Sequence, residues 1–389
     1  MPLLPAAFLV VALFTPQAAE AQQSYGLISR LGRDTVVVER ITRTGDKVVG
    51  DIIERSPRVV QRHYEATLKG DGSIELYVLD TKVLNPDAGR PSSSHLQAHF
   101  AGTEMHLNTS NNVDTTVKSS TIPYTDALAM PWLLYGPGSY EMIFAAALKR
   151  SGDSIPVGAY SPGGRAVSHN FIKRLANGGA SIDFFGTPIV AKVSAQGQLL
   201  SMSAAATTIK LETMRLAKAP DIEAIAARFA ATEKAAGPAA ALSVRDTARA
   251  TVGTAALLVD YGRPLTRGRT ILGNVVPLGE VWRTGANAAT QFTTSTALTI
   301  GGLDVAPGTY TLWTLPTASG VQLIVNKQTK QWGTEYHAEQ DLGRVAVTTE
   351  KLGAPVEKFT MSIVPVSATT GKLVIEWDTF RWAAPIVVR

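Results

Sequence analysis

The feature that most constrains this chain is an alternation of apolar and polar residues with a period of two. The segment DTVVVERITRTGDKVVGDIIERS (34–56) alternates on both sides of a Thr-Gly-Asp turn, and RHYEATLKGDGSIELYVLD (62–80) repeats the pattern around Gly70-Asp71-Gly72. Side chains along a strand point alternately to its two faces, and Asp-Gly supplies the positive φ of tight hairpin turns. The pattern therefore predicts antiparallel β structure.

The alternation continues to about residue 216, and we expect residues 22–216 to form one antiparallel sheet domain. One helical insert is predicted from Ser139 to a stop at Gly152, because apolar residues there recur at helical spacing. A long meander with a helical insert resembles the half-barrel of periplasmic lipoprotein carriers. That resemblance implies carriage of an apolar ligand inside the curved sheet.

Residues 217–243 differ in composition and mark a domain boundary. Pro220 suits a first helical turn, Ile222, Ile225 and Phe229 form one apolar stripe, and Gly237-Pro238 stops the helix. A helix followed by an Ala/Pro linker is therefore predicted. From residue 244 to 389 the strands are short and closely spaced, which is typical of an antiparallel β-sandwich. The predicted fold class is mainly β, with two domains as expected for this length.

The N-terminus predicts export. Leu3–Phe14 is an apolar run of twelve residues, and Ala19-Glu20-Ala21 fits the small-x-small cleavage pattern, so a signal peptide is expected over residues 1–21. Twelve residues make a helix of only about 18 Å, too short for a ~30 Å hydrocarbon core. With no other long apolar run, we expect a soluble, periplasmic or secreted protein without a transmembrane segment.

Composition excludes several kinds of chemistry. The chain has no cysteine, which removes disulfides, thiolate nucleophiles and cysteine metal ligands. Its net charge of +5 comes without a dense run of lysine or arginine, so no nucleic-acid partner is expected. The sequence leaves the oligomeric state open.

Several separated blocks near the C-terminus occur in a specific order. They are Tyr261, Arg263 and Pro264; Gly268 and Arg269; Val276, Pro277 and Gly279; Trp282, Arg283, Gly285, Ala286 and Asn287; Asn326 and Lys327; and Trp332 and Gly333. In this order they resemble the bacterial domain-of-unknown-function 2911 family over about residues 245–387. The resemblance implies an exported β-rich fold and brings no established activity.

The same blocks contain the candidate binding residues. Flat aromatic faces beside arginine forks and an amide suit a sugar, or a ligand bearing a carboxylate or phosphate. The candidates are Arg263, Arg269, Trp282, Arg283, Asn287, Lys327 and Trp332. The alternative is a network that only holds loops in place, because irregular segments need their buried backbone groups satisfied. Whichever of the two holds, we expect Trp282 to be mostly buried. Arg283 and Asn287 are then the residues that line any site.

Catalysis is harder to find in the sequence. Neither a Gly-x-Ser-x-Gly elbow nor a phosphate-binding Walker loop is present. A cell-envelope or extracellular hydrolase would have to use Asp260, Glu280 or His337 as acid or base. Three further histidines are His95, His99 and His106. His95 and His99 would lie too far apart along a strand to bind one ion, but a turn at Gly102 could bring His99 opposite His106. No metal or cofactor is predicted, and whether the protein is an enzyme stays open. A non-catalytic binding module is the preferred reading, ahead of the hydrolase and the carrier.

Overall fold

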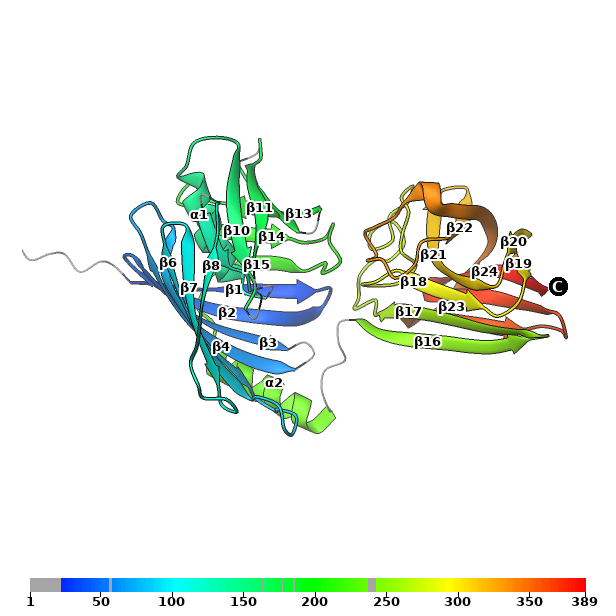
Figure 1. The fold of residues 1–389 in the computed structure, drawn as a ribbon, viewed down its shortest axis with the longest axis horizontal. Helices are drawn as coiled ribbons and strands as arrows, with labels where there is room; N and C mark the ends of the chain where they lie inside the picture. Colours follow the sequence, from blue (N-terminus) through cyan, green and yellow to red (C-terminus); the bar gives the residue numbers. More distant parts are fainter. Residues whose placement is uncertain are drawn as a thin grey trace, which may run out of the picture.

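The computed structural model describes residues 22–389 apart from 56–57, 127, 134, 163, 165, 177, 185 and 237–242. Two antiparallel sheets, each with its own core, make up the described chain (Figure 1). The mainly β prediction is confirmed. The expected signal peptide, the expected helix stop at Gly237-Pro238 and most of the expected linker lie outside the described residues.

The first sheet contains fifteen described strands in the order β8-β7-β6-β5-β4-β3-β2-β1-β15-β14-β13-β12-β11-β10-β9. Their bounds are β1 (Gln23–Leu31), β2 (Asp34–Thr44), β3 (Lys47–Arg55), β4 (Val59–Leu68), β5 (Ile74–Val83), β6 (Ser93–Ala101), β7 (Glu104–Asn111), β8 (Lys118–Pro123), β9 (Leu128–Pro131), β10 (Ser154–Tyr160), β11 (Val167–Arg174), β12 (Ala180–Phe184), β13 (Thr187–Val193), β14 (Leu199–Ser203) and β15 (Glu212–Leu216). All neighbours pair antiparallel except β9 and β10, which run parallel. Strand β1 joins the two halves of the sheet, because it pairs with β2 on one side and with β15 on the other.

The first sheet curves around helix α1 (Pro137–Leu148), which lies in its concave side (Figure 1). The helix sequence PGSYEMIFAAAL is apolar or small almost all round, as a helix buried on every side requires. At its first turn the backbone N–H of Gly138 donates to the Glu39 carboxylate at 2.8 Å, and the Tyr64 hydroxyl donates to the other oxygen at 2.8 Å. Burial raises the pKa of Glu39 to about 8.

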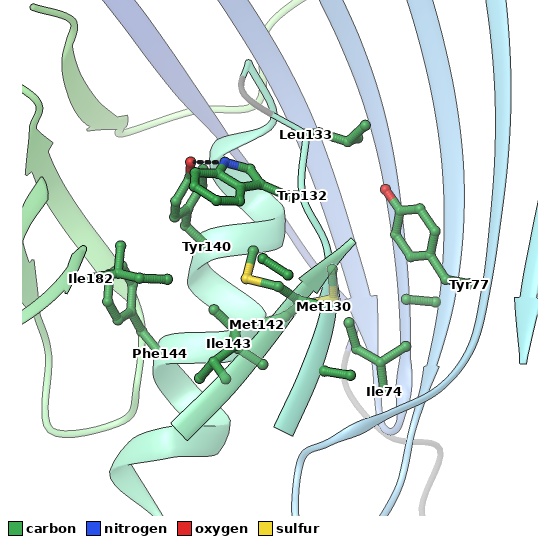
Figure 2. Close-up of a cluster of buried hydrophobic side chains, with 14 of the residues drawn as sticks. Ile74, Tyr77, Met130, Trp132, Leu133, Tyr140, Met142, Ile143, Phe144 and Ile182 are labelled. Atoms are coloured by element: carbon green, nitrogen blue, oxygen red, sulfur yellow. Dashed lines mark hydrogen bonds between the residues drawn. The ribbon is translucent and has the colours of Figure 1, made fainter. Parts of the chain in front are cut away.

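Side chains fill the space between α1 and the sheet (Figure 2). Trp132 and Tyr140 meet there, with the indole N–H donating to the phenol oxygen at 2.6 Å. One cavity, between α1 and strands β13 to β15, measures about 20 Å³, room for one water molecule. This cavity is too small for an apolar ligand of the kind that the carrier hypothesis requires.

Helix α2 (Ile222–Ala236) packs on the opposite face of the first sheet. Ile222 and Phe229, two members of the stripe predicted from the sequence, are buried against Val38 and Ile53. The polar side of the helix is tied down as well, since Arg40 on β2 donates to the carboxylate of Glu223. Within the described residues α1 and α2 are the two α-helices, and neither is long and apolar enough to cross a membrane.

The second sheet contains nine described strands in the order β16-β17-β18-β21-β22-β23-β24-β19-β20. Their bounds are β16 (Ser243–Val252), β17 (Ala255–Pro264), β18 (Thr290–Thr294), β19 (Leu298–Ile300), β20 (Leu303–Val305), β21 (Gly308–Thr317), β22 (Gly320–Asn326), β23 (Asp341–Pro365) and β24 (Thr370–Val388), with a short 3₁₀ turn η1 (Ala338–Gln340) before β23.

This second sheet forms two layers by folding over on itself. Strand β23 has 25 residues and pairs with β22 through its first part and with β24 over most of its length (Figure 1). Its later part lies against β17, where the Tyr261 hydroxyl donates to the Met361 carbonyl at 3.5 Å. One continuous hydrogen-bonded sheet therefore supplies both layers of the sandwich.

Candidate functional site

Trp282 belongs to the core of the second sheet. It is 5% exposed, stacks on Trp377 with ring centroids 5.9 Å apart, and meets Phe359 edge-on at 5.4 Å. Its backbone N–H and C=O both pair with Thr314, at 2.8 and 2.9 Å. Trp282 is buried, as the sequence predicted, and its ring is not free to stack on a ligand.

Arg263 is fully engaged with its own sheet. Its guanidinium donates to the Phe359 carbonyl at 3.1 Å, to Asp246 at 2.9 Å and to the Thr360 hydroxyl at 3.0 Å. The bonds to Phe359 and Thr360 hold β17 to β23 across the two layers, and the bond to Asp246 ties β17 to its neighbour β16. Of the candidate arginines, Arg263 is thus the one placed as a structural tether.

The chain bends sharply after Arg283. Gly285 and Ala286 pass so close to β17 that a Cβ on Gly262 would overlap the Ala286 carbonyl. The bend brings Asn287 back beside Arg283, and both contact Gly333: the Gly333 N–H donates to the Asn287 carbonyl at 3.0 Å, and Arg283 donates to the Gly333 carbonyl at 3.3 Å. The two family blocks around Arg283 and Gly333 therefore meet in one place.

Arg283 is half-buried, and its charge has little compensation. Within the described part of the chain it donates one long hydrogen bond, to Gly333, and forms no ion pair, and its Nε is buried without a partner. Burial lowers the pKa of Arg283 to about 10. A buried cation without an anion is costly, because it has lost its water without gaining a countercharge.

Lys210 lies within the electrostatic reach of both Arg283 and a second arginine, Arg269. Arg269 donates to the carbonyls of Leu265 and Thr266 at 2.7 and 3.0 Å, and burial, followed by the charge of Arg267, lowers its pKa to about 10. Lys210 comes from the loop between β14 and β15 of the first sheet. Burial and then the charges of Arg283 and Arg269 lower its pKa to about 8.

Contacts between the two sheets explain how Lys210 reaches this place. The turn between β1 and β2 docks on residues 265–269: the Arg33 N–H donates to the Arg267 carbonyl at 2.9 Å, and Arg267 pairs with Asp34. A Cβ on Gly32 would lie 2.9 Å from the Arg269 side chain. Arg30 pairs with Glu212 in the antiparallel β1–β15 register. Gly32 comes two residues after Arg30 and Lys210 two residues before Glu212, so both lie at the same end of the sheet.

The remaining binding candidates lie at the edge of this cluster or away from it. Trp332 is 41% exposed and forms a backbone bridge with Ala288, one residue beyond Asn287. Lys327 is exposed just after β22, and its backbone N–H donates to the Gln340 carbonyl of η1.

The three acid/base candidates have separate partners. Asp260 forms a salt bridge with Arg245 at 2.8 Å, and His337 pairs with Glu339 at 3.1 Å. Glu280 is exposed and attracts Lys210. Within the described residues no hydrogen bond or ion pair joins any two of the three.

The three histidines noted in the sequence lie on strands β6 and β7. His99 and His106 pair across these strands with ring centroids 6.3 Å apart, while His95 binds Asp80 at 2.8 Å. Over the part of the chain that is described, no three histidine, aspartate or glutamate side chains are placed to hold a metal ion.

Sequence reasoning missed Lys210. The alternation that predicts β14 and β15 treats the loop between them as a connection, and nothing in the loop sequence indicates what it contacts. Its one local signal is a positive φ of 54°, which a sequence does not display.

Comparison with known proteins gives one family match. Residues 243–386 match the model of a family described as "Protein of unknown function (DUF2911)", which confirms the resemblance stated for the C-terminal part. No curated protein matches the chain. A crystal structure of a DUF1089 family protein from Pseudomonas aeruginosa is similar at 11% identity and a TM-score of 0.33, over 44% of this chain and 91% of that one. The resemblance of the first sheet to lipoprotein-carrier half-barrels is not confirmed.

Proposed function

We propose that residues 243–386, the part that matches a family of unknown function, carry a non-catalytic binding site for a small anion, a carboxylate or a phosphate, centred on the Arg283 guanidinium. The observation that carries the proposal is the half-buried Arg283 guanidinium, which has a buried, unpartnered Nε and no ion pair among the described residues. An anion would supply the missing acceptor and the missing countercharge at once.

Charge favours an anion over a neutral sugar. Arg283, Arg269 and Lys210 gather here, with Glu280 as the carboxylate that attracts Lys210. Asp34 and Glu357, which also attract Arg269, are already engaged with Arg267 and Arg33. A sugar hydroxyl would satisfy hydrogen bonds but would leave the excess positive charge in place.

The alternative is that Arg283 only holds the 331–333 segment in place. Its contact with the Gly333 carbonyl fits that role, but one hydrogen bond at 3.3 Å uses little of a five-donor guanidinium. A structural arginine resembles Arg263 instead, which has three partners.

Calorimetric titration tests the proposal. Inorganic phosphate, succinate and glucose are titrated into the wild type and into the Arg283→Lys variant, with Arg249→Lys on β16 as the matched control. We expect the wild type to bind phosphate or succinate and not glucose. Arg283→Lys should lose this binding because lysine lacks the planar fork, and Arg249→Lys should retain it. Absence of binding by both anions, or unfolding of Arg283→Lys at ordinary temperature, would leave the structural role as the explanation.

Export is part of the same proposal. The expected signal peptide would place the anion site outside the cytoplasm, in the periplasm or medium. Intact-mass measurement on protein recovered from the cell envelope should show a chain that begins at Gln22; a chain that retains residues 1–21 would overturn this.

A further inference from the structure

We propose that the anion is held by both sheets together: Lys210 of the first sheet completes the site formed by Arg283 and Arg269 of the second, so that binding a phosphate group locks the two sheets in one arrangement. This inference rests on the proposed function and adds to it the ligand class and a mechanical consequence.

The placement of Lys210 follows from the backbone. Arg30 and Glu212 are the last register pair of β1 and β15 at this end of the sheet, and Gly32 lies two residues later, in the β1–β2 turn, against the Arg269 side chain. Lys210 lies two residues before Glu212, on the same end. Its Nζ donates to the Ala205 carbonyl at 2.9 Å, and two of its three N–H donors form no further hydrogen bond within the described residues.

The charges across this contact are unbalanced. The first sheet contributes Arg33 and Lys210, and the second contributes Arg267, Arg269 and Arg283. Three carboxylates accompany these five cations: Asp34, Glu357 and Glu280. The excess of two positive charges is shared between the sheets, so Lys210 repels Arg269 and Arg283 across the contact.

A phosphate group matches this arrangement in charge and in geometry. Its dianion balances an excess of two, its tetrahedral oxygens can accept from an arginine fork, and a lysine adds a point charge from another direction. The phosphate can contact Lys210 and the two arginines together only when the two sheets are docked. It therefore binds the docked arrangement more tightly than any other arrangement, and so favours it.

The absence of cysteine from the chain makes the test direct. Cysteines introduced at Ser151 and Lys351, exposed positions on the first and second sheets, accept spin labels at those two places only. Distance distributions between the labels are then measured in the full chain with inorganic phosphate, with glycerol phosphate, with succinate, and with chloride at the same ionic strength. Phosphate affinity is measured on the same samples by calorimetry.

We expect inorganic phosphate or glycerol phosphate to narrow the distribution of distances between the labels. The one of these two that binds more tightly shows whether the ligand is free phosphate or a phosphate ester. Lys210→Ala should bind phosphate at least tenfold more weakly and show no narrowing. Lys210→Arg should restore both, because it restores the charge, and Lys192→Ala on β13 is the matched control.

The two proposals fail differently. If phosphate binds Lys210→Ala as tightly as the wild type, or binds the wild type without narrowing the distribution, the joint site is wrong and the Arg283 site stands. Narrowing by succinate alone would reject the phosphate assignment. If no anion binds any variant, the proposed function itself is wrong. Circular dichroism shows whether Lys210→Ala is folded. If it is unfolded, phosphate binding and the label distances in Lys210→Arg are used to judge the joint site.

Discussion

Arg263 and Arg283 are the same residue type, twenty positions apart in one set of family blocks, and the fold uses them in opposite ways. The Arg263 guanidinium donates hydrogen bonds to both layers of its own sheet, while Arg283 lies half-buried beside Gly333 with its Nε buried and unpartnered. A sequence displays the side chain but not the direction of its fork. The structure separates a tether from a candidate site at the level of single hydrogen bonds.

Trp282 gives the first prediction at this scale. Trp282→Ala should lower the free energy of unfolding by about 3–5 kcal/mol, because it removes a large ring packed between Phe359 and Trp377. Urea denaturation measures the change. Trp332→Ala is the control, since that ring is 41% exposed and should cost well under half as much. Equal costs would mean that Trp282 is not a core residue.

Glu39 gives a second prediction, on pH. Its pKa rises from the ordinary 4.5 to about 8, so the folded chain keeps a proton that the unfolded chain releases. The contribution of Glu39 to stability is therefore full below about pH 4.5, falls as the pH rises towards 8, and is level above it. Glu39→Gln should remove this fall.

The measurement compares the free energy of unfolding at pH 5 and pH 8 in the wild type, in Glu39→Gln and in Glu75→Gln, an exposed control on β5. We expect the wild type and Glu75→Gln to lose stability between the two values, and Glu39→Gln to lose less. A parallel loss in all three would show that Glu39 is ionised in the folded protein.

At the scale of elements, the close approach of the 284–287 bend to β17 decides where Arg283 and Asn287 meet. Gly262 has no space for a side chain, because a Cβ there would overlap the Ala286 carbonyl. Gly262→Ala should therefore push the bend off β17 and cost about 1–3 kcal/mol, the usual range for overpacking. Gly353→Ala, with nothing within 4 Å of its Cβ, should change little. Thermal unfolding compares the two, and equal midpoints would contradict the close contact.

The elements show how far the sequence alone could lead. Period-two alternation predicts the antiparallel strands, and the stripe with Ile222 and Phe229 is part of the surface that α2 buries. What the alternation cannot show is that β23 bends and serves both layers, since each half of that strand has the same local pattern as an ordinary strand. Pairing of β1 with β15 is equally invisible, because it joins segments at opposite ends of the first sheet's sequence.

For the candidate site the limit was different. Arg269, Arg283 and Asn287 could be named because they lie in recognisable blocks, and the Gly285-Ala286 bend suggested that Asn287 returns to Arg283. Lys210 could not be named from the sequence, since its role depends on how the two sheets dock on each other. Residue type and spacing carry local geometry, and contacts between sheets are set by the whole fold.

At the scale of the whole molecule, Arg267 and Asp34 form an ion pair between the sheets that is less exposed than the Arg33–Glu357 pair, with side chains 10% and 28% exposed. Asp34→Ala, Arg267→Ala and the double variant should reveal a coupling energy of about 1–3 kcal/mol in urea unfolding, because the pair is largely removed from water. The exposed pair Asp114–Lys118 is the control and should couple by about 0.5 kcal/mol or less. Additive effects of the two interface substitutions would show that the sheets are not held by this pair.

The pairing of β1 with β15 also has a consequence in time. Gly26 pairs with Leu216, about 190 residues later, so during synthesis β1 emerges long before one of its two partners exists. Its neighbours β2 to β8 can form a meander at once, since each contacts the strand next to it in the chain. Until β15 arrives, the other edge of β1 presents unpaired backbone groups of the kind that recruit foreign strands. Completion of the first sheet is therefore a late, long-range step, and the nascent chain is most exposed to aggregation before that step occurs.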